Sequence, residues 1–240
     1  MRFTLECRKI KKTGFVSAFV GGGILSALVP VLDMALRSEM YIGRNSPPVE
    51  ILLDADWQMM AMLNILLVVT GACIMYNTEF AENAIQRMCT LPTTESVMFF
   101  GKAAVMTVAG IMVLVIEAGS VFYCSEYWFG QSIDLYEDTF KNFAFLFMLM
   151  LPTIMTSLLI ASACRNMWIS LGIGVLCIFT ATMIPAQSFV LSLFPFALPF
   201  QTLSGKAVDV ISNYVAACFT EIVVIGVLEI IFLKVRRVFE

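Results

Sequence analysis

The sequence predicts an all-helical integral membrane protein with six transmembrane helices. Sixty per cent of its 240 residues are hydrophobic, 14% are charged, and the mean hydropathy is +0.88. Soluble domains are about 45–50% apolar and about 25% charged, so a water-soluble fold could not cover this much apolar surface. Apolar runs long enough to cross a bilayer also alternate with short polar stretches along the chain.

Six apolar runs are the predicted spans, and together they make one transmembrane domain over residues 1–240. The runs are 14–36, 58–76, 97–123, 143–164, 167–185 and 213–232. In the first run, Gly21-Gly22-Gly23 and Pro30 favour a bend or a close helix contact. A cleaved signal peptide is the alternative for this run, but the run is longer than a signal h-region and lacks a small-x-small cleavage site.

The distribution of Lys and Arg predicts that both termini lie in the cytosol. With six spans, the cytosolic side then holds basic residues at 2, 8, 9, 11, 12, 87, 102, 165, 234, 236 and 237, and the outer side those at 37, 44, 141 and 206. Residues 1–12 also place Phe3, Cys7 and Ile10 at helical spacing. We therefore expect a basic amphipathic helix on the membrane surface there, with a plain cytosolic retention signal as the alternative.

The charged stretch 77–95 separates the second span from the third and is predicted to be cytosolic. In a helix from about 78 to 91, one apolar stripe is formed by Phe80, Ala84, Met88 and Leu91. Pro92 should end this helix, because a residue before proline is disfavoured in the α region. Thr93 or Thr94 can then cap the next helix, and Lys102 can extend to the cytosolic interface. An ordinary solvated loop with an interfacial helix is the alternative.

This stretch resembles the intracellular coupling region of ABC-2-type permeases. The resemblance rests on Asn77-Thr78-Glu79, on Thr90-Leu91-Pro92-Thr93-Thr94 and on Gly101-Lys102. The basic N-terminus is similar to that family's elbow helix, and the six spans match its layout. Within the family, the chain resembles small permeases of lantibiotic-immunity and peptide-antibiotic transporters, although Thr93-Thr94-Glu95 departs from the hydroxyl-arginine pattern found in some members.

The resemblance implies a function and partners. Two permeases, as two copies or as paralogues, would pair in the bacterial cytoplasmic membrane, and each would dock one subunit of a cytosolic ATPase dimer that binds ATP and magnesium. The implied substrate is an antimicrobial peptide or a similar amphipathic compound, exported for immunity or resistance. The residues implied in coupling to the ATPase are Glu79, Glu82, Gln86, Arg87 and Pro92.

A nucleotide-binding P-loop requires the pattern GxxxxGK[ST], and the two closest stretches of this chain lack it. Gly101-Lys102 is followed by Ala103 and is preceded by Ser96 at the first glycine position. Gly205-Lys206 is followed by Ala207, with Phe200 at that position. We therefore expect a non-enzymatic transport subunit, with ATP hydrolysis on a separate chain.

Carboxylates within the predicted spans are candidates for function, because exposing a charge to lipid costs several kcal/mol. Glu117 lies midway along the third span and Glu221 lies in the sixth. Each is either part of a transport pathway or a hydrogen-bonded packing residue. Glu229 lies near Lys234, which favours an interfacial ion pair.

The segment 187–204 is too apolar for a free loop and too interrupted by proline for a span. We expect one or two short helices that dip into the outer leaflet. ABC-2 permeases are similar in having such helices, which cover the pathway as a lid, and the residues implied are Phe194, Pro195, Phe196 and Pro199. A passive aromatic anchor at the interface is the alternative.

Other function classes have little support in the sequence. The chain contains no histidine, which removes the commonest metal ligand and the histidine-based catalytic arrangements, and no metal site is predicted. Its seven cysteines form no CxxC pair and suit small buried hydrophobes. The near-neutral charge predicts no nucleic-acid partner. A non-transporting sensor or assembly partner remains an alternative, and an intramembrane hydrolase is a weaker one.

Overall fold

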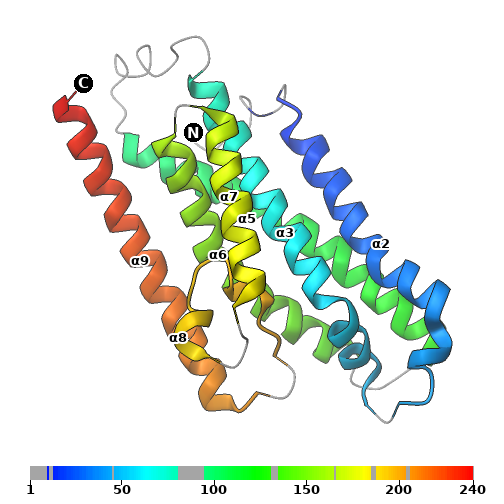
Figure 1. The fold of residues 1–240 in the computed structure, drawn as a ribbon. Coiled ribbons are helices and arrows are strands. Elements are labelled where there is room, and N and C mark those ends of the chain that lie inside the picture. Colours follow the sequence, from blue (N-terminus) through cyan, green and yellow to red (C-terminus); the bar gives the residue numbers. More distant parts are fainter. Residues whose placement is uncertain are drawn as a thin grey trace.

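Long helices running the full length of one bundle dominate the architecture (Figure 1). The computed structural model describes residues 10, 13–44, 46–80, 95–130, 135–164, 166–184, 188–203 and 206–239. These residues form helices and no strands. In chain order the elements are α2 (Phe15–Tyr41), α3 (Pro48–Phe80), α5 (Glu95–Cys124), the π-helical turn η2 (Ser125–Phe129), α6 (Leu135–Ala163), α7 (Met167–Met183), α8 (Phe189–Ser192), the 3₁₀ turn η3 (Leu198–Phe200) and α9 (Val208–Phe239).

Within the described part of the chain, five helices are long and apolar enough to cross a membrane: α2, α3, α5 continued by η2, α6 and α9. This finding confirms the predicted class of all-helical, multi-pass membrane protein. The predicted fifth span corresponds to α7, an apolar helix of 17 residues. Spanning helices usually have about 20 residues, with about 17 as the lower limit. The count of six spans therefore stays a prediction.

The helices alternate in direction, so that each end of the bundle collects particular helix ends (Figure 1). At one end α2 begins, α3 ends, α5 begins and α9 ends; we call it the Phe80 end. At the other, the Asp33 end, α2 ends and α3 begins, and α8 lies in that half of the bundle. The predicted cytosolic segment 77–95 starts in the last turn of α3, and its residues 81–94 lie outside the described residues.

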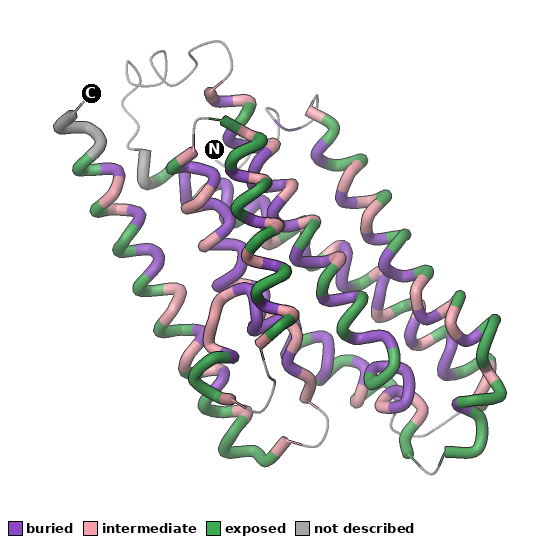
Figure 2. Tube along the Cα trace, in the orientation of Figure 1, coloured by how far each residue is buried: buried purple, intermediate pink, exposed green. Residues whose placement is uncertain are grey.

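The centre of the bundle is formed by α3 and α6, and α9 lies at its periphery (Figure 2). In the 18-residue apolar centre of each helix, 61% of residues are buried in α3 and in α6, against 22% in α9. The exposed side chains of α9 are mostly apolar, among them Phe219, Val223 and Ile231. Such a surface suits lipid or another membrane helix rather than water.

Small residues allow α3 to approach its neighbours closely. A Cβ built on Gly22 of α2 would lie 2.2 Å from a methyl carbon of Leu67 in α3. A Cβ on Gly174 of α7 would lie 2.3 Å from Cγ1 of Val69, also in α3. Because glycine has no side chain, the side chains of α3 pack directly against the backbone of the neighbouring helix at these contacts. Close packing of this kind helps to hold helices together in lipid. The close helix contact predicted from the glycines at 21–23 is thus present at Gly22.

Several helices extend beyond the apolar runs that predicted them. The helix α3 begins at Pro48, in a stretch expected to be a polar loop, with proline at its first position and Glu50 in its first turn. Both features favour a helix start. The stretch 124–142, between the third and fourth predicted spans, contains η2 and the start of α6. Residues 78–80, expected to open a separate cytosolic helix, instead complete α3.

The contact between α3 and α7 can be tested with Gly174→Ala. The new methyl group would meet Val69, whose branched side chain has little freedom to move aside. We expect a loss of about 1–3 kcal/mol in stability, measured as thermal unfolding in detergent. The control is Gly172→Ala in the same helix, where a Cβ meets nothing within 4 Å. Equal stability of the two variants would contradict this packing.

Candidate functional site

A buried ion pair connects α3 and α5 at the Phe80 end. The Nζ atom of Lys102 lies 2.6 Å from Oε1 of Glu79, and their side chains are only 2% and 5% exposed. The ammonium group also lies 4.8 Å from the centre of the Tyr76 ring, where a cation is attracted by the ring face. The pair is a charge-assisted hydrogen bond shielded from solvent, which is the strong form of this contact.

The sequence places both partners on buried helix faces. Tyr76 and Glu79 are three residues apart in the last turns of α3 and so share one side of that helix. On α5, the buried residues Phe99 and Met106 flank Lys102 at helical spacing. The expectation that Lys102 extends to the membrane interface is therefore wrong. Its side chain lies on the face of α5 that packs inside the bundle.

The structure also changes the interpretation of Glu79. Its carboxylate is directed at Lys102 and its side chain is 5% exposed, so Glu79 lies inside the bundle, and its predicted role in coupling to the ATPase stays a prediction. The remaining residues predicted for coupling, Glu82, Gln86, Arg87 and Pro92, lie outside the described residues. Their role stays a prediction from the sequence.

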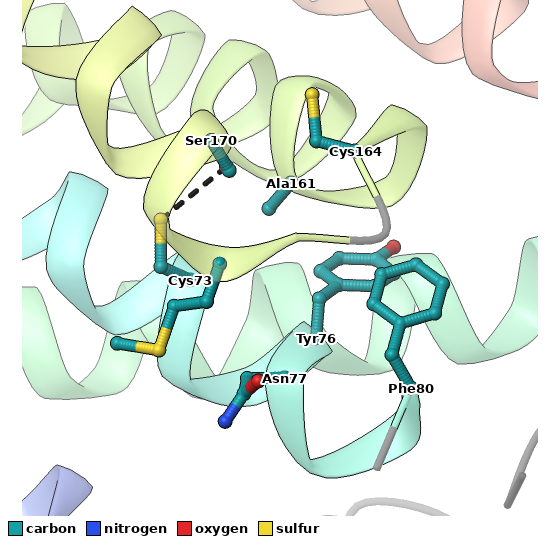
Figure 3. Close-up of a pocket in the computed structure, with 8 residues that line it drawn as sticks. Cys73, Tyr76, Asn77, Phe80, Ala161, Cys164 and Ser170 are labelled. Carbon is teal, nitrogen blue, oxygen red and sulfur yellow. Dashed lines mark hydrogen bonds between the residues drawn. The ribbon is translucent and has the colours of Figure 1, made fainter.

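A small pocket lies next to this pair, where α3 meets the end of α6 and the start of α7 (Figure 3). The residues that line it are Cys73, Tyr76, Asn77, Phe80, Ala161, Cys164, Met167 and Ser170. In Figure 3, the Cys73 thiol is directed at the Ser170 hydroxyl, and their sulfur and oxygen atoms are 3.3 Å apart. The pocket has essentially no room for a water-sized molecule, whereas typical ligand sites enclose about 300–1,000 Å³. It is a notch between packed helices rather than a substrate site.

A second polar cluster lies in the middle of the bundle around Glu117, which is fully buried. Ser26 of α2 donates a hydrogen bond to Oε1 of Glu117, and Nδ2 of Asn64 in α3 donates to Oε2 at 2.9 Å. Three helices thus meet at one carboxyl group whose two oxygens are both hydrogen-bonded. This geometry favours the packing role of Glu117 over a pathway role.

The two glutamates of α9 differ in environment. Glu229 is 1% exposed and accepts a hydrogen bond from Ser162 of α6 at 3.1 Å, whereas Lys234 is exposed. Glu221 is half-buried, and its Oε2 atom has no hydrogen-bond partner within the described part of the chain. Of the two predicted intramembrane glutamates, Glu117 is therefore satisfied within the described bundle and Glu221 is not.

The predicted outer lid is built from α8, η3 and the turns around them. Phe196 is fully buried and packs with Ile65 and Val69 of α3, and Pro199 is buried as well. Phe194 lies beside Phe196, with ring centres 5.6 Å apart, and the carbonyl of Pro195 accepts a hydrogen bond from Thr153 of α6. A passive interfacial anchor would present its rings to lipid, so the burial of Phe196 favours a segment inserted into the bundle.

Polar contacts connect this segment to the start of α9. The hydroxyl oxygens of Ser192 and Tyr214 are 2.8 Å apart, and Tyr214 Oη donates to Gln201 at 3.4 Å. Lys206 donates to the same Gln201 oxygen at 2.7 Å and lies over the Tyr214 ring. Burial lowers the pKa of Lys206 to about 8. The segment is thus held on one side by α3 and α6 and on the other by α9.

Residues 3–181 match the family model described as ABC-2 family transporter protein. The chain belongs to this family. No curated protein and no solved structure matches it. The resemblance seen in the sequence is confirmed at the level of the ABC-2 permeases, and the chain is a membrane permease subunit of an ABC transporter. The matched region contains the Glu79–Lys102 pair and the Glu117 cluster, and α8, η3 and α9 follow it along the chain.

Sequence reasoning missed three partners in the sites of this ABC-2 permease: Lys102 as the ion partner of Glu79, and Ser26 and Asn64 as donors to Glu117. A signal for Lys102 was present, because Phe99, Ala103 and Met106 surround it at positions that share a helix face. Ser26 and Asn64 carried no such signal. Their meeting with Glu117 depends on how three helices rotate about their axes.

The role of Glu117 can be tested by comparing Glu117→Gln with Glu117→Leu. Glutamine can still accept from Asn64 and accept from or donate to Ser26, so we expect stability close to that of the parent protein. Leucine leaves the buried amide of Asn64 without its acceptor, and we expect a loss of about 1–2 kcal/mol. Thermal unfolding in detergent measures both. A large loss in Glu117→Gln would show that the charge itself is needed.

Proposed function

We propose that this permease is the transmembrane subunit of an ATP-driven exporter and is driven by a separate cytosolic ATPase through segment 81–94. The observation that carries the proposal is the buried Glu79–Lys102 pair. It joins the last turn of α3 to the second turn of α5, and segment 81–94 is the part of the chain between those two helices. A force applied to the segment therefore acts on two helices that are held to each other at its base.

In this proposal the residues of the coupling region have two kinds of role. Glu82, Gln86 and Arg87 contact the ATPase, Pro92 ends the helix that carries them, and Glu79 holds the base of the segment. ATP and magnesium are bound by the ATPase dimer. The Phe80 end then faces the cytosol of a bacterial cell and the Asp33 end faces outward, as the Lys and Arg distribution predicts.

The proposed substrate is an antimicrobial peptide or a similar amphipathic compound, expelled for immunity or resistance. Two features of the fold support this class. The segment 188–203 inserts aromatic and proline residues between α3, α6 and α9 at the proposed outer end, where it can act as a lid. The described helices also expose wide apolar surfaces, through which a membrane-bound amphipathic molecule could reach the protein.

A second permease copy or a paralogue completes the proposed transporter, and α9 offers a surface for it. The half-buried carboxyl group of Glu221 lies on the least covered of the long helices. Intramembrane carboxylates almost always face protein or a water-filled cavity, because contact with lipid is costly. Packing of a second permease against this face of α9 would remove Glu221 from lipid.

The docking role can be tested by charge reversal with Glu82→Lys and Arg87→Glu together. Because each proposed contact would then meet a like charge, we expect the ATPase to be lost from the purified permease, while the permease keeps its thermal stability. The measurement is co-purification of the ATPase with the permease from native membranes. The control is Glu126→Lys with Lys141→Glu, two exposed residues at the Asp33 end. Normal ATPase recovery with the first double variant would contradict the docking assignment.

A further inference from the structure

We propose that the Asp33 end of the bundle contains a binding site for a primary ammonium group, formed by Asp56 of α3, Asp33 of α2 and Ser125 of η2. The ammonium group belongs to an amphipathic molecule at the outer membrane surface, either a lysine-bearing substrate or the lipid phosphatidylethanolamine. The inference rests on the proposed function for the outward direction of this end and for the substrate. The site itself is defined within the permease.

A buried carboxylate without a partner is the starting observation. Asp56 is 6% exposed, and its Oδ2 atom has no hydrogen-bond partner among the described residues. The other buried carboxylates of the described bundle each accept a hydrogen bond, namely those of Glu79, Glu117 and Glu229. An unsatisfied buried polar group destabilises a fold, and a charged one does so more strongly. Asp56 therefore suits a partner that comes from outside the chain.

A second carboxylate lies close to the first. Asp33 of α2 is the charged side chain that acts electrostatically on Asp56. Its surroundings depend on a kink in α2 at Arg37, whose φ of −135° is not helical. Beyond the kink, Tyr41 hydrogen-bonds Asp33, although a straight helix would place the two residues about 12 Å apart along its axis. Two like charges held this close repel each other, and a cation between them relieves the repulsion.

The cations near this pair leave it with excess negative charge. Nη1 of Arg37 lies 3.7 Å from Oδ1 of Asp33, but the arginine side chain is 66% exposed. Exposed ion pairs of this kind contribute little. Arg44 lies over the ring of Tyr41, 5.2 Å from its centre. Asp56 has no ion pair with a described residue, so its carboxylate remains available as an acceptor.

The third element at this point is the π-helical turn η2, which contacts α3. Cys124, directly before η2, lies within range of the Asp56 charge. The next residue, Ser125, is fully buried, and its hydroxyl oxygen has no hydrogen-bond partner within the described part of the chain. Single π-helical turns are rare and occur frequently at functional sites. Two adjoining elements thus each bring an unsatisfied buried polar group to this end of the bundle.

The chemistry of these side chains favours an ammonium group over a metal ion. An ammonium group is a compact charge that offers only N–H donors, which matches two carboxylates and a hydroxyl group. Calcium takes about six to eight oxygen ligands. The described residues contain no group of three or more acidic, histidine or cysteine side chains that could hold a metal ion. The side chain of Asp33 is 17% exposed, which provides the open side of the site.

The test measures binding to the intact permease, without ATPase, in nanodiscs of phosphatidylcholine. Octylamine is the probe, and octanol is the matched ligand without the charge. The chain has three tryptophans, and Trp168→Phe removes the one at the start of α7. The remaining fluorescence then comes from Trp57, next to Asp56 in the chain, and from Trp128 of η2. We expect a saturable change with octylamine and none with octanol.

Substitutions then locate the bound probe. Asp56→Asn loses a charge-assisted hydrogen bond, so we expect octylamine affinity to fall by about tenfold or more. Ser125→Ala loses a neutral acceptor, and we expect a smaller fall. The matched control is Asp54→Asn, the same change at an exposed position of α3, which should leave the affinity unchanged. If Asp56→Asn does not fold, Asp33→Asn replaces it, and an unchanged affinity in that variant overturns the site.

Thermal unfolding separates a binding role of Asp56 from a structural one. Octylamine should raise the unfolding temperature of the parent permease and not that of Asp56→Asn, because a ligand stabilises only the state that binds it. Without ligand, we expect Asp56→Asn to be at least as stable as the parent, since it removes an unpartnered charge beside Asp33. An equal stabilisation of both proteins by octylamine would overturn the assignment.

Competition identifies the source of the ammonium group. Weaker octylamine binding in nanodiscs that contain phosphatidylethanolamine indicates the lipid, and displacement by an amphipathic peptide with lysine as its only cation indicates the substrate. The assignment is overturned if neither competes, if octanol binds equally well, or if calcium chloride displaces octylamine. Because no ATPase is present, failure of this test leaves the proposed function standing. Loss of ATPase co-purification would remove the proposed function and leave the measured site.

Discussion

The structure depends on one constraint, which is that polar groups inside a lipid-embedded bundle must find their partners within the protein. Water is absent from the bilayer core, so an unsatisfied carboxyl group there costs several kcal/mol. Four of the contacts that join distant parts of this chain meet that requirement. Lys102 neutralises Glu79, Ser26 and Asn64 hold Glu117, and Ser162 donates to Glu229. The hydroxyl groups of Ser192 and Tyr214 form a further contact, between α8 and α9.

Apolar packing brings these helices together, but it depends little on how each helix is rotated about its own axis. The polar contacts select one arrangement.

Two of these contacts, Lys102–Glu79 and Asn64–Glu117, attach α3 to α5, and α3 also lies at the centre of the apolar packing. It supplies Glu79 near one end, Asn64 in the middle, and between these two the residues Ile65 and Val69 that share a buried cluster with Phe196. It also accepts the closest helix approaches, through Leu67 and Val69. A helix held at so many points moves as one body, since each neighbour restrains a different part of it. The proposed coupling segment 81–94 therefore follows, along the chain, the most constrained of the described helices.

The sequence was sufficient for the class of fold and for the family, but it was insufficient for the sites. The apolar runs located the long helices of the described residues, because an apolar run of about 20 residues is typical of a membrane-spanning helix. The helix ends were missed where polar residues continue a helix beyond the apolar run, as at Pro48–Trp57 in α3. Lys102 was expected at the membrane interface, but its side chain is buried in the bundle, because an apolar run does not show which face of a helix packs inward. Glu79 was predicted to contact the ATPase, which stays a prediction, and its ion partner was missed because Lys102 lies in another helix and no local pattern joins the two. Ser26 and Asn64 were missed for the same reason.

The two buried glutamates of the matched region illustrate how similar residues can serve different purposes. Glu117 is held by two neutral donors from two helices, so no single movement frees it, and the cluster suits a fixed junction. Glu79 lies 2.6 Å from the Lys102 ammonium group, in a pair that joins α3 to α5. The attraction between two charges falls off slowly with distance, whereas a neutral hydrogen bond needs close and well-aligned atoms. The Glu117 cluster therefore fixes the relative rotation of its three helices more strictly than the ion pair fixes that of α3 and α5.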